Sequence, residues 1–402
     1  MKKLMKVAYK TPPQENWNFF RDETQCNENF ITDEHYARLA EAGFTHGLAL
    51  LEHGADVAKR ALAMAEKYGL QYYVRDEINW ANILHKDFYY LNGDNYRAYQ
   101  QSPAFAGIYV CDEPNADKYP ALQQMVQGYY DFFGTIGEPL VNLLPTYAND
   151  VEQLGAASYE EYIERYAQQV PTDYLLYDHY PFRYSSKGEW RFHDDYLHNA
   201  QVVASACKRH GKELRAFVQA CDVDENGGAL MEEMLSMQVH THLAFGAKAL
   251  VYYYYWGGLC SKNDGIVTEQ GKPTPIYDAV KKLHAQVARY EEALMECTWE
   301  KTLFVKGGVI HHNEKEFARE DCSANGIVQA DYDCIVGVLS YRGETAYYLV
   351  NYVNPLLALQ NKIRVKFDRE YQAFFAEHTG QVCDECEIVL RCGVGVFFLP
   401  KA

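Results

Sequence analysis

The clearest fold signal in the chain is the stretch FAGIYVCDEP, residues 105–114. Its first six residues are almost all apolar, which is typical of a strand buried on both faces of a sheet. The apolar run leads directly into Asp112 and Glu113. Pro114 then stops the strand, because proline has no backbone N–H to donate to a neighbouring strand. The stretch therefore predicts a buried strand that carries two carboxylates at its carboxyl end.

Seven similar runs alternate with helical patterns over residues 1–297. Together with Phe105–Val110, the expected strands are Lys6–Tyr9, His46–Leu51, Gln71–Arg75, Pro139–Leu144, Tyr174–Tyr177, Leu214–Gln219 and Ala249–Trp256. Four of the intervening helical segments end just before a glycine. Glycine readily adopts the left-handed backbone conformation that often ends a helix. These segments are Thr32–Ala42, Ala55–Tyr68, Pro120–Phe133 and Tyr196–His210. A further apolar stripe from Ile276 to Leu294 predicts one last helix.

Eight strand–helix units in this length and order predict a (β/α)8 TIM barrel spanning residues 1–297. A doubly wound sheet is the alternative, but it would usually show a glycine fingerprint after its first strand, and none is present. Residues 298–402 instead show period-2 alternation between turn residues, which predicts a C-terminal antiparallel β-sandwich domain.

Composition narrows the possible partners. The 402 residues contain 38 Lys and Arg against 55 Asp and Glu, a formal net charge of −17. This acidity argues against binding to nucleic acid or to an anionic membrane surface, both of which favour basic patches. No apolar signal-peptide core follows the first lysines, and the 11 scattered cysteines suit reduced thiols, so we expect a cytoplasmic protein. The 34 tyrosines could line a sugar-binding cleft, or they could simply pack in the hydrophobic core.

Carboxylates recur at the predicted strand ends, where a barrel of this type places its active site. Acidic residues follow six of the eight strands. Converging carboxylates repel one another and raise each other's pKa, so such a rim is costly unless it is used. Two chemistries use it. Glycoside hydrolysis needs one protonated and one ionised carboxyl, and divalent-metal enzymes need carboxylate ligands.

Several stretches resemble bacterial (β/α)8-barrel glycoside hydrolases of the beta-galactosidase-like group. The strand ending in Asp112-Glu113-Pro114 is similar to their fourth strand, and Leu243–Leu250 running into Tyr252–Trp256 is similar to their seventh helix and eighth strand. The loop and helix start at Gly271–Tyr277 also resemble that group. The resemblance implies that Glu113 is the general acid. In the large retaining clan an Asn precedes this Glu and a second Glu follows strand 7, whereas here Asp112 and Gln219-Ala220-Cys221-Asp222 occupy those places.

We therefore predict a cytoplasmic hydrolase of carbohydrate metabolism, a glycosidase with Glu113 as catalytic acid and Asp178 or Asp222 as the partner carboxylate. The side chains expected to bind substrate are Glu77, Asp112, Tyr147, His179, Tyr180, Gln219, Tyr255 and Trp256. Two alternatives stay open: a metal-dependent barrel hydrolase or isomerase, and a catalytically inactive carbohydrate-binding barrel.

No cofactor and no metal is expected. The sequence has no glycine-rich phosphate loop and no serine nucleophile elbow. His240 and His242 look like a metal motif, but inside a helix residues two apart point about 200° away from each other. Cys383 and Cys386 could form a zinc site with Cys322 and Cys334, although two cysteines at a hairpin turn are the simpler interpretation.

Overall fold

A computed structural model describes residues 3–14, 28–50, 52, 54–75, 93–148, 151–258, 263–305, 307, 327–357, 359–367, 369–382 and 385–401. Among these residues, no helix is long and apolar enough to cross a membrane.

The N-terminal part is the predicted barrel. Its strands are β1 (Met5–Tyr9), β2 (His46–Leu48), β3 (Gln71–Val74), β4 (Phe105–Asp112), β5 (Glu138–Asn142), β6 (Tyr174–Tyr177), β9 (Glu213–Gln219) and β10 (Ala249–Tyr253). They form one parallel sheet in the order β5-β4-β3-β2-β1-β10-β9-β6. A parallel bridge between Leu143 and Tyr177 joins the two outer strands. All eight strands expected from the sequence are present, and the fold class is confirmed.

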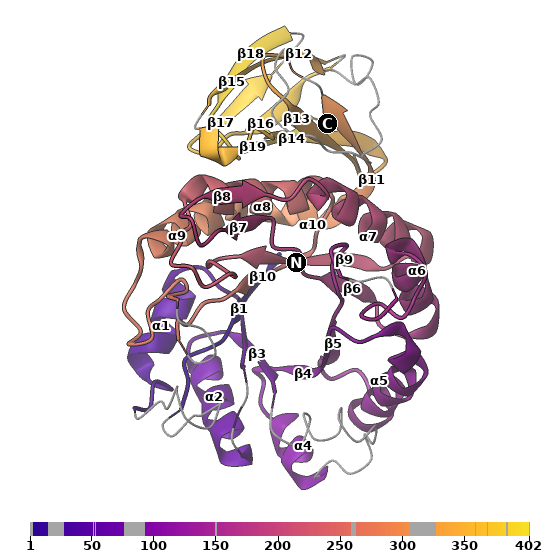
Figure 1. Ribbon diagram of the computed structural model, residues 1–402, viewed down its shortest axis with the longest axis vertical. Helices are drawn as coiled ribbons and strands as arrows, with labels where there is room; N and C mark the ends of the chain where they lie inside the picture. Colours follow the sequence, from indigo (N-terminus) through magenta and orange to yellow (C-terminus); the bar gives the residue numbers. More distant parts are fainter. Residues whose placement is uncertain are drawn as a thin grey trace.

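Helices surround the strands (Figure 1). They are α1 (Asp33–Glu41), α2 (Ala55–Lys67), α4 (Gly93–Tyr99), α5 (Tyr119–Phe133), α6 (Tyr159–Gln169), α7 (Tyr196–His210), α8 (Glu232–Ala244), α9 (Pro275–Ala288) and α10 (Glu291–Glu296), with a 3-10 turn at Ala116–Lys118. The prediction of a single helix from Ile276 to Leu294 is wrong, because α9 ends at Ala288 and a second helix, α10, begins after Tyr290. There the Tyr290 hydroxyl lies 2.6 Å from that of Tyr348 in the C-terminal part.

The C-terminal part is an antiparallel β-sandwich. One sheet contains β11 (Thr298–Val305), β13 (Cys334–Tyr341), β14 (Glu344–Asn351), β19 (Gly395–Pro400), β16 (Tyr371–Phe374) and β17 (Thr379–Val382), in that order. The other contains β12 (Ile327–Ala330), β15 (Asn361–Lys366) and β18 (Glu385–Leu390). The period-2 alternation noted for residues 298–402 thus corresponds to antiparallel strands, as predicted.

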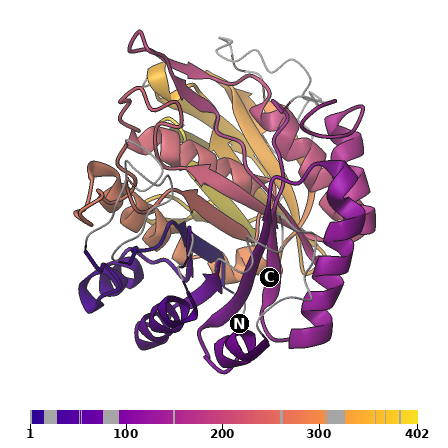
Figure 2. The same cartoon turned by 60° about the horizontal axis from the view of Figure 1, so that its bottom comes forward.

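The sandwich packs against the barrel on the side of α8 (Figures 1 and 2). The His240 ring on α8 lies 2.8 Å from the Tyr348 hydroxyl on β14, and one buried apolar cluster runs from the barrel into Tyr348 and Phe397. Because this core is continuous, the division into domains 1–297 and 298–402 stays a prediction.

One addition to the barrel matters for the site. Between β6 and α7 the chain forms a hairpin of β7 (Phe182–Tyr184) and β8 (Trp190–Phe192). It lies at the carboxyl end of β6, on the same end of the barrel as Glu113.

Candidate active site

Glu113 stands at the carboxyl end of β4 in an unusual backbone conformation. A β-bulge lies between Tyr109 and Cys111, where β4 pairs with β5. Glu113 then adopts φ +48°, and its N–H donates to the carbonyl of Asn142 at 2.9 Å. Positive φ is costly for a residue with a side chain, and such strain is concentrated at functional sites. The local fold therefore holds the Glu113 side chain in place at the barrel mouth.

Asp178 meets Glu113 from the end of β6. Each carboxyl acts on the pKa of the other, so the two are neighbours, and we call them the carboxyl pair. Glu113 is reachable by solvent, whereas Asp178 is only 5% exposed and one of its oxygens, Oδ1, has no hydrogen-bond partner in the described structure. The sequence placed both residues at strand ends, and the structure brings them together.

The pKa values of both carboxyls are raised. Although Glu113 is accessible, protein surrounds it closely enough that desolvation raises its pKa to about 7, helped by the negative charge of Asp112 and opposed by the hydrogen bond to Asp178. Burial, then the charges of Glu113 and Asp112, raise the pKa of Asp178 well above its usual value. Side-chain hydrogen bonds from Tyr180 and Asn142 act in the opposite direction. Such a pair holds a proton near neutral pH.

Asp112 supports the carboxyl pair from the side. Its Oδ1 accepts a hydrogen bond from Nδ2 of Asn142 at 3.2 Å, and its Oδ2 lies 3.9 Å from the guanidinium of Arg75. Arg75 is buried, donates to the Tyr9 hydroxyl at 3.1 Å and lies over the ring of Tyr109. Asp112 is thus a charged neighbour of Glu113 within a fixed polar network.

Aromatic rings line the same end of the barrel. Tyr180 and Tyr253 are half-buried, and their ring centroids lie 4.8 Å apart. Tyr147 is 37% exposed, and its hydroxyl accepts a hydrogen bond from the backbone N–H of Tyr180 at 3.4 Å. Burial raises the pKa of Tyr147, and the charges of Asp178 and Glu113 add to the shift. The hydrogen bond to Tyr180 holds this ring near the end of β6, from which Asp178 comes.

His179 and Gln219 hold loops in this region. The His179 ring is buried and its Nε2 lies 2.9 Å from Asp195, whose other oxygen accepts from Thr146 at 2.6 Å. Gln219 is fully buried, accepts from the backbone N–H of Phe182 and donates to the carbonyl of Phe182, so it anchors the start of the hairpin. Both were predicted to contact substrate. In the structure both side chains are buried, and they hold the segments around the barrel mouth in place.

Asp222 is occupied by its own loop. It is 1% exposed, and its two oxygens accept backbone N–H groups of Asp224, Asn226 and Gly228 at 2.9–3.0 Å. A carboxylate used this way caps a turn. The geometry therefore favours Asp178 over Asp222 as the partner of Glu113.

Tyr255 and Trp256, predicted as sugar platforms, are corrected by the structure. Tyr255 is fully buried against Phe44, and Trp256 is 1% exposed against Phe30 and His35. Strand β10 ends at Tyr253, before both of these residues. Glu77, the last predicted binding residue, lies outside the described residues.

Metal-ligand geometry is not found within the described ranges, where no group of three or more His, Cys, Asp or Glu could hold an ion. His240 and His242 both lie on α8, as predicted, and bind different hydroxyls: His240 that of Tyr348, His242 that of Tyr196. Cys322 and Cys383 lie outside the described residues.

Sequence reasoning missed three contributors: Asn142, Arg75 and the hairpin. The sequence did contain a signal for the hairpin, because Phe182-Arg183-Tyr184 and Trp190-Arg191-Phe192 alternate around Lys187-Gly188. Asn142 had no such signal, since its role depends on lying opposite Asp112 in the sheet.

No protein-family model matches the sequence, and no curated protein matches it. Solved structures of similar shape include endoglucanase Cel5A from Pseudomonas stutzeri in complex with cellobiose, at 12% identity and TM-score 0.49, covering 70% of this chain and 92% of that one. A beta-galactosidase from Marinomonas ef1 gives 10% and 0.47, covering 76% and 63%. A glucosidase from Croceicoccus marinus gives 8% and 0.43, covering all of both chains. Similarity at this level carries no information about the reaction of this chain.

Proposed function

We propose that this protein is a glycoside hydrolase that cleaves an O-glycosidic bond with Glu113 and Asp178. The observation that carries the proposal is the carboxyl pair. Two carboxyls from different strand ends meet at the barrel mouth, with raised pKa values and one member accessible to solvent. Glycoside hydrolysis needs two carboxyls that differ in protonation.

Glu113 is the general acid. With a pKa of about 7, it keeps its proton in the neutral range and can still release it. As the bond to the anomeric carbon breaks, the Glu113 carboxyl protonates the departing oxygen. Its accessible position lets the leaving group approach, and its strained backbone keeps the side chain directed at the mouth.

Asp178 is the nucleophile. Burial raises its pKa, so Asp178 carries the attacking charge when the shared proton of the pair lies on Glu113, and Tyr180 and Asn142 favour that ionised form. A sugar ester on Asp178 would form, and water deprotonated by Glu113 would then release the sugar and regenerate both carboxyls. Inverting enzymes keep their carboxyls about 6.5–9.5 Å apart to admit water, and retaining enzymes about 5–5.5 Å. We propose the retaining route, in which Asp178 rather than a water molecule attacks the sugar.

The surrounding rings suit a sugar. Tyr147, Tyr180 and Tyr253 give the mouth flat apolar faces with hydroxyls at their edges, which can contact a sugar ring and exclude water. A carbohydrate substrate agrees with the acidic net charge, which disfavours polyanionic partners. The cytoplasmic location stays a prediction.

The test is a panel of aryl glycosides assayed with the wild type, Glu113→Gln and Glu66→Gln. Glu66 is exposed on α2 and is the matched control. We expect turnover of at least one glycoside, a loss of about 10²–10⁴-fold in Glu113→Gln on a glycoside with a poor leaving group, and no loss in the control. Near-full activity of Glu113→Gln would reject the assignment.

The two alternatives give different results in the same assay. A metal-dependent enzyme would lose turnover on chelation and regain it when the metal is restored. A non-catalytic sugar-binding barrel would bind sugar in calorimetry without hydrolysing any glycoside. Our proposal expects turnover that chelation leaves unchanged.

A further inference from the structure

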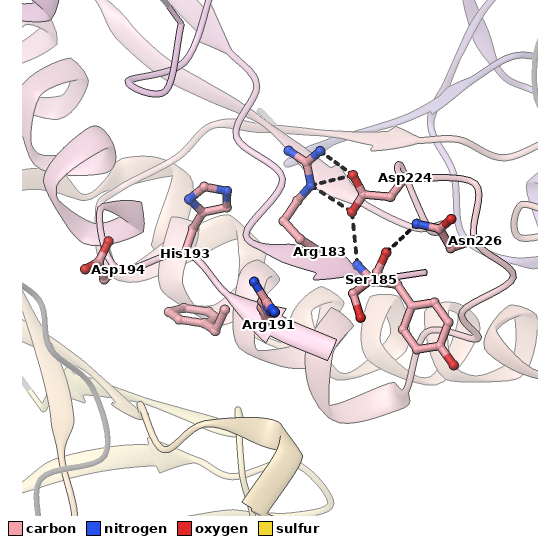
Figure 3. Close-up of a pocket in the computed structure, with 9 residues that line it drawn as sticks. Arg183, Ser185, Arg191, His193, Asp194, Asp224 and Asn226 are labelled. Carbon is pink, nitrogen blue, oxygen red and sulfur yellow. Dashed lines mark hydrogen bonds and ion pairs between the residues drawn. The ribbon is translucent and has the colours of Figure 1, made fainter. Parts of the chain in front are cut away.

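A cavity of about 690 Å³ lies between the β7–β8 hairpin and the loop after β9 (Figure 3). This volume falls within the range of about 300–1,000 Å³ typical of ligand sites. Tyr147 links the cavity to the region of the carboxyl pair. His193 in the cavity lining stacks on Tyr147 with ring centroids 5.2 Å apart, and the Tyr147 hydroxyl accepts from the backbone N–H of Tyr180, two residues after Asp178.

The walls of the cavity are fixed to each other. Nε of Arg183 donates to both oxygens of Asp224 at 3.0 and 2.9 Å, and the backbone N–H of Tyr184 donates to the same carboxylate at 3.0 Å. Nδ2 of Asn226 donates to the carbonyl of Tyr184 at 2.7 Å. At Gly228 the loop lies so close to the Tyr184 ring that an added Cβ would come within 2.5 Å of it. Hairpin and loop therefore form one preorganised pocket.

Two arginines face each other across the hairpin. Arg183 and Arg191 are paired in register, and like charges at directly opposite positions destabilise a sheet. Asp224 neutralises Arg183, whereas Arg191 is exposed and has no ion pair within the described ranges. Arg191 lines the cavity, so its guanidinium offers hydrogen-bond donors there.

The formal charges of the pocket cancel. Arg183 and Arg191 oppose Asp224 and Asp194, and burial lowers the pKa of His193, which favours its neutral form. Donors and acceptors thus lie together without net charge, next to the Tyr184 ring. This composition suits a ligand with many hydroxyl groups and no charge.

We propose that this pocket is a second sugar-binding subsite, which holds a neutral sugar unit adjoining the unit bound at the carboxyl pair. The protein would then act on an oligosaccharide rather than on a single-sugar glycoside. This inference rests on the proposed function for the place of the cleaved bond, but the binding it describes needs no turnover.

The test uses the Glu113→Gln protein and a glycan array. The array carries neutral cello-, manno-, xylo- and galacto-oligosaccharides of one to four units, with uronate and sulfated counterparts. The best neutral series is then titrated by calorimetry. We expect the longer glycan to bind at least tenfold more tightly than the shortest one bound. Adding Arg191→Ala should bring this ratio close to one, whereas Arg60→Ala, an exposed arginine on α2, should leave it unchanged.

Several outcomes would overturn the inference: no gain with length, an unchanged ratio in Arg191→Ala, or preferred binding of uronate or sulfated glycans. Hydrolysis of aryl glycosides by the wild type without any gain with length would reject the subsite and keep the proposed function. Length-dependent binding without hydrolysis would keep the subsite and reject the function.

Discussion

Replacing Asp112 with asparagine should lower the pKa of Glu113 and move the alkaline limb of the pH–rate profile toward acid. The general acid works only when protonated, so activity falls as the pH rises through the pKa of Glu113, which is about 7. Asp112 is the second largest cause of that raised value, after burial. Asparagine removes the charge and keeps the shape.

The size of the effect follows from Coulomb's law. Two charges about 6 Å apart interact by ~2.8 kcal/mol at an effective dielectric constant of 20 and by ~0.7 kcal/mol in bulk water. These energies correspond to ~2 and ~0.5 pKa units. Because burial is the larger cause and Glu113 is open to solvent, we expect the limb to move down by about one unit.

The assay is the pH dependence of kcat/KM on any aryl glycoside that the wild type hydrolyses. In Asp112→Asn the new side chain can turn its amide oxygen toward Asn142, and Arg75 keeps the Tyr9 hydroxyl and the Tyr109 ring, so the variant should fold. Asp56→Asn on α2, whose side chain is 98% exposed, is the matched control and should leave the limb in place.

An alkaline limb that stays where it is in Asp112→Asn, or moves toward base, would refute this reasoning. Either result would mean that the charge of Asp112 does not act on the group that limits activity at high pH.

Three further predictions concern the surrounding residues. Asp178→Asn should abolish turnover and raise Tm, and the gain in Tm should be larger at pH 8 than at pH 4. Below pH ~4 the Asp178 carboxyl is protonated in both the folded and the unfolded protein, so it costs no stability there. As the pH rises, this carboxyl ionises in the unfolded chain, whereas its raised pKa opposes ionisation in the folded protein, and the folded state loses stability. An equal or smaller gain at pH 8 would contradict the buried state of Asp178. Asp222→Asn should keep turnover within about tenfold and lose about 1–2 kcal/mol of unfolding free energy in a denaturant titration. The amide oxygen can still accept from Asn226 and Gly228, so one backbone N–H, that of Asp224, loses its acceptor. Loss of all turnover in a folded variant would return Asp222 to the catalytic role. Tyr255→Phe removes a buried hydroxyl with no partner in the described structure, so KM should stay unchanged and the unfolding free energy should stay within about 1 kcal/mol of wild type or rise; a higher KM would place Tyr255 at the substrate.

The strands and the position of Glu113 could be predicted because their signals are local. A strand buried on both faces is a short apolar run, and the residue that follows it lies at the barrel mouth whatever the rest of the chain does. Asp178 was accessible to the same reasoning. Its contact with Glu113 was not, since it depends on how β4 and β6 are placed around the barrel.

The sequence did not indicate which side chains after the strands point toward the barrel mouth. Trp256 follows a barrel strand in the sequence, yet the chain turns after Tyr253 and Trp256 packs against Phe30 and His35. Asp222 also follows a strand, but its backbone folds around its own carboxylate. Only three-dimensional packing separates these residues from those that face the mouth.

The most direct test of the central claim is the anomeric configuration of the first sugar released, followed by proton NMR before mutarotation. Attack by Asp178 means double displacement, so the product should have the configuration of the substrate. A first product of opposite configuration would show single displacement by water and would contradict the assignment of Asp178 as nucleophile.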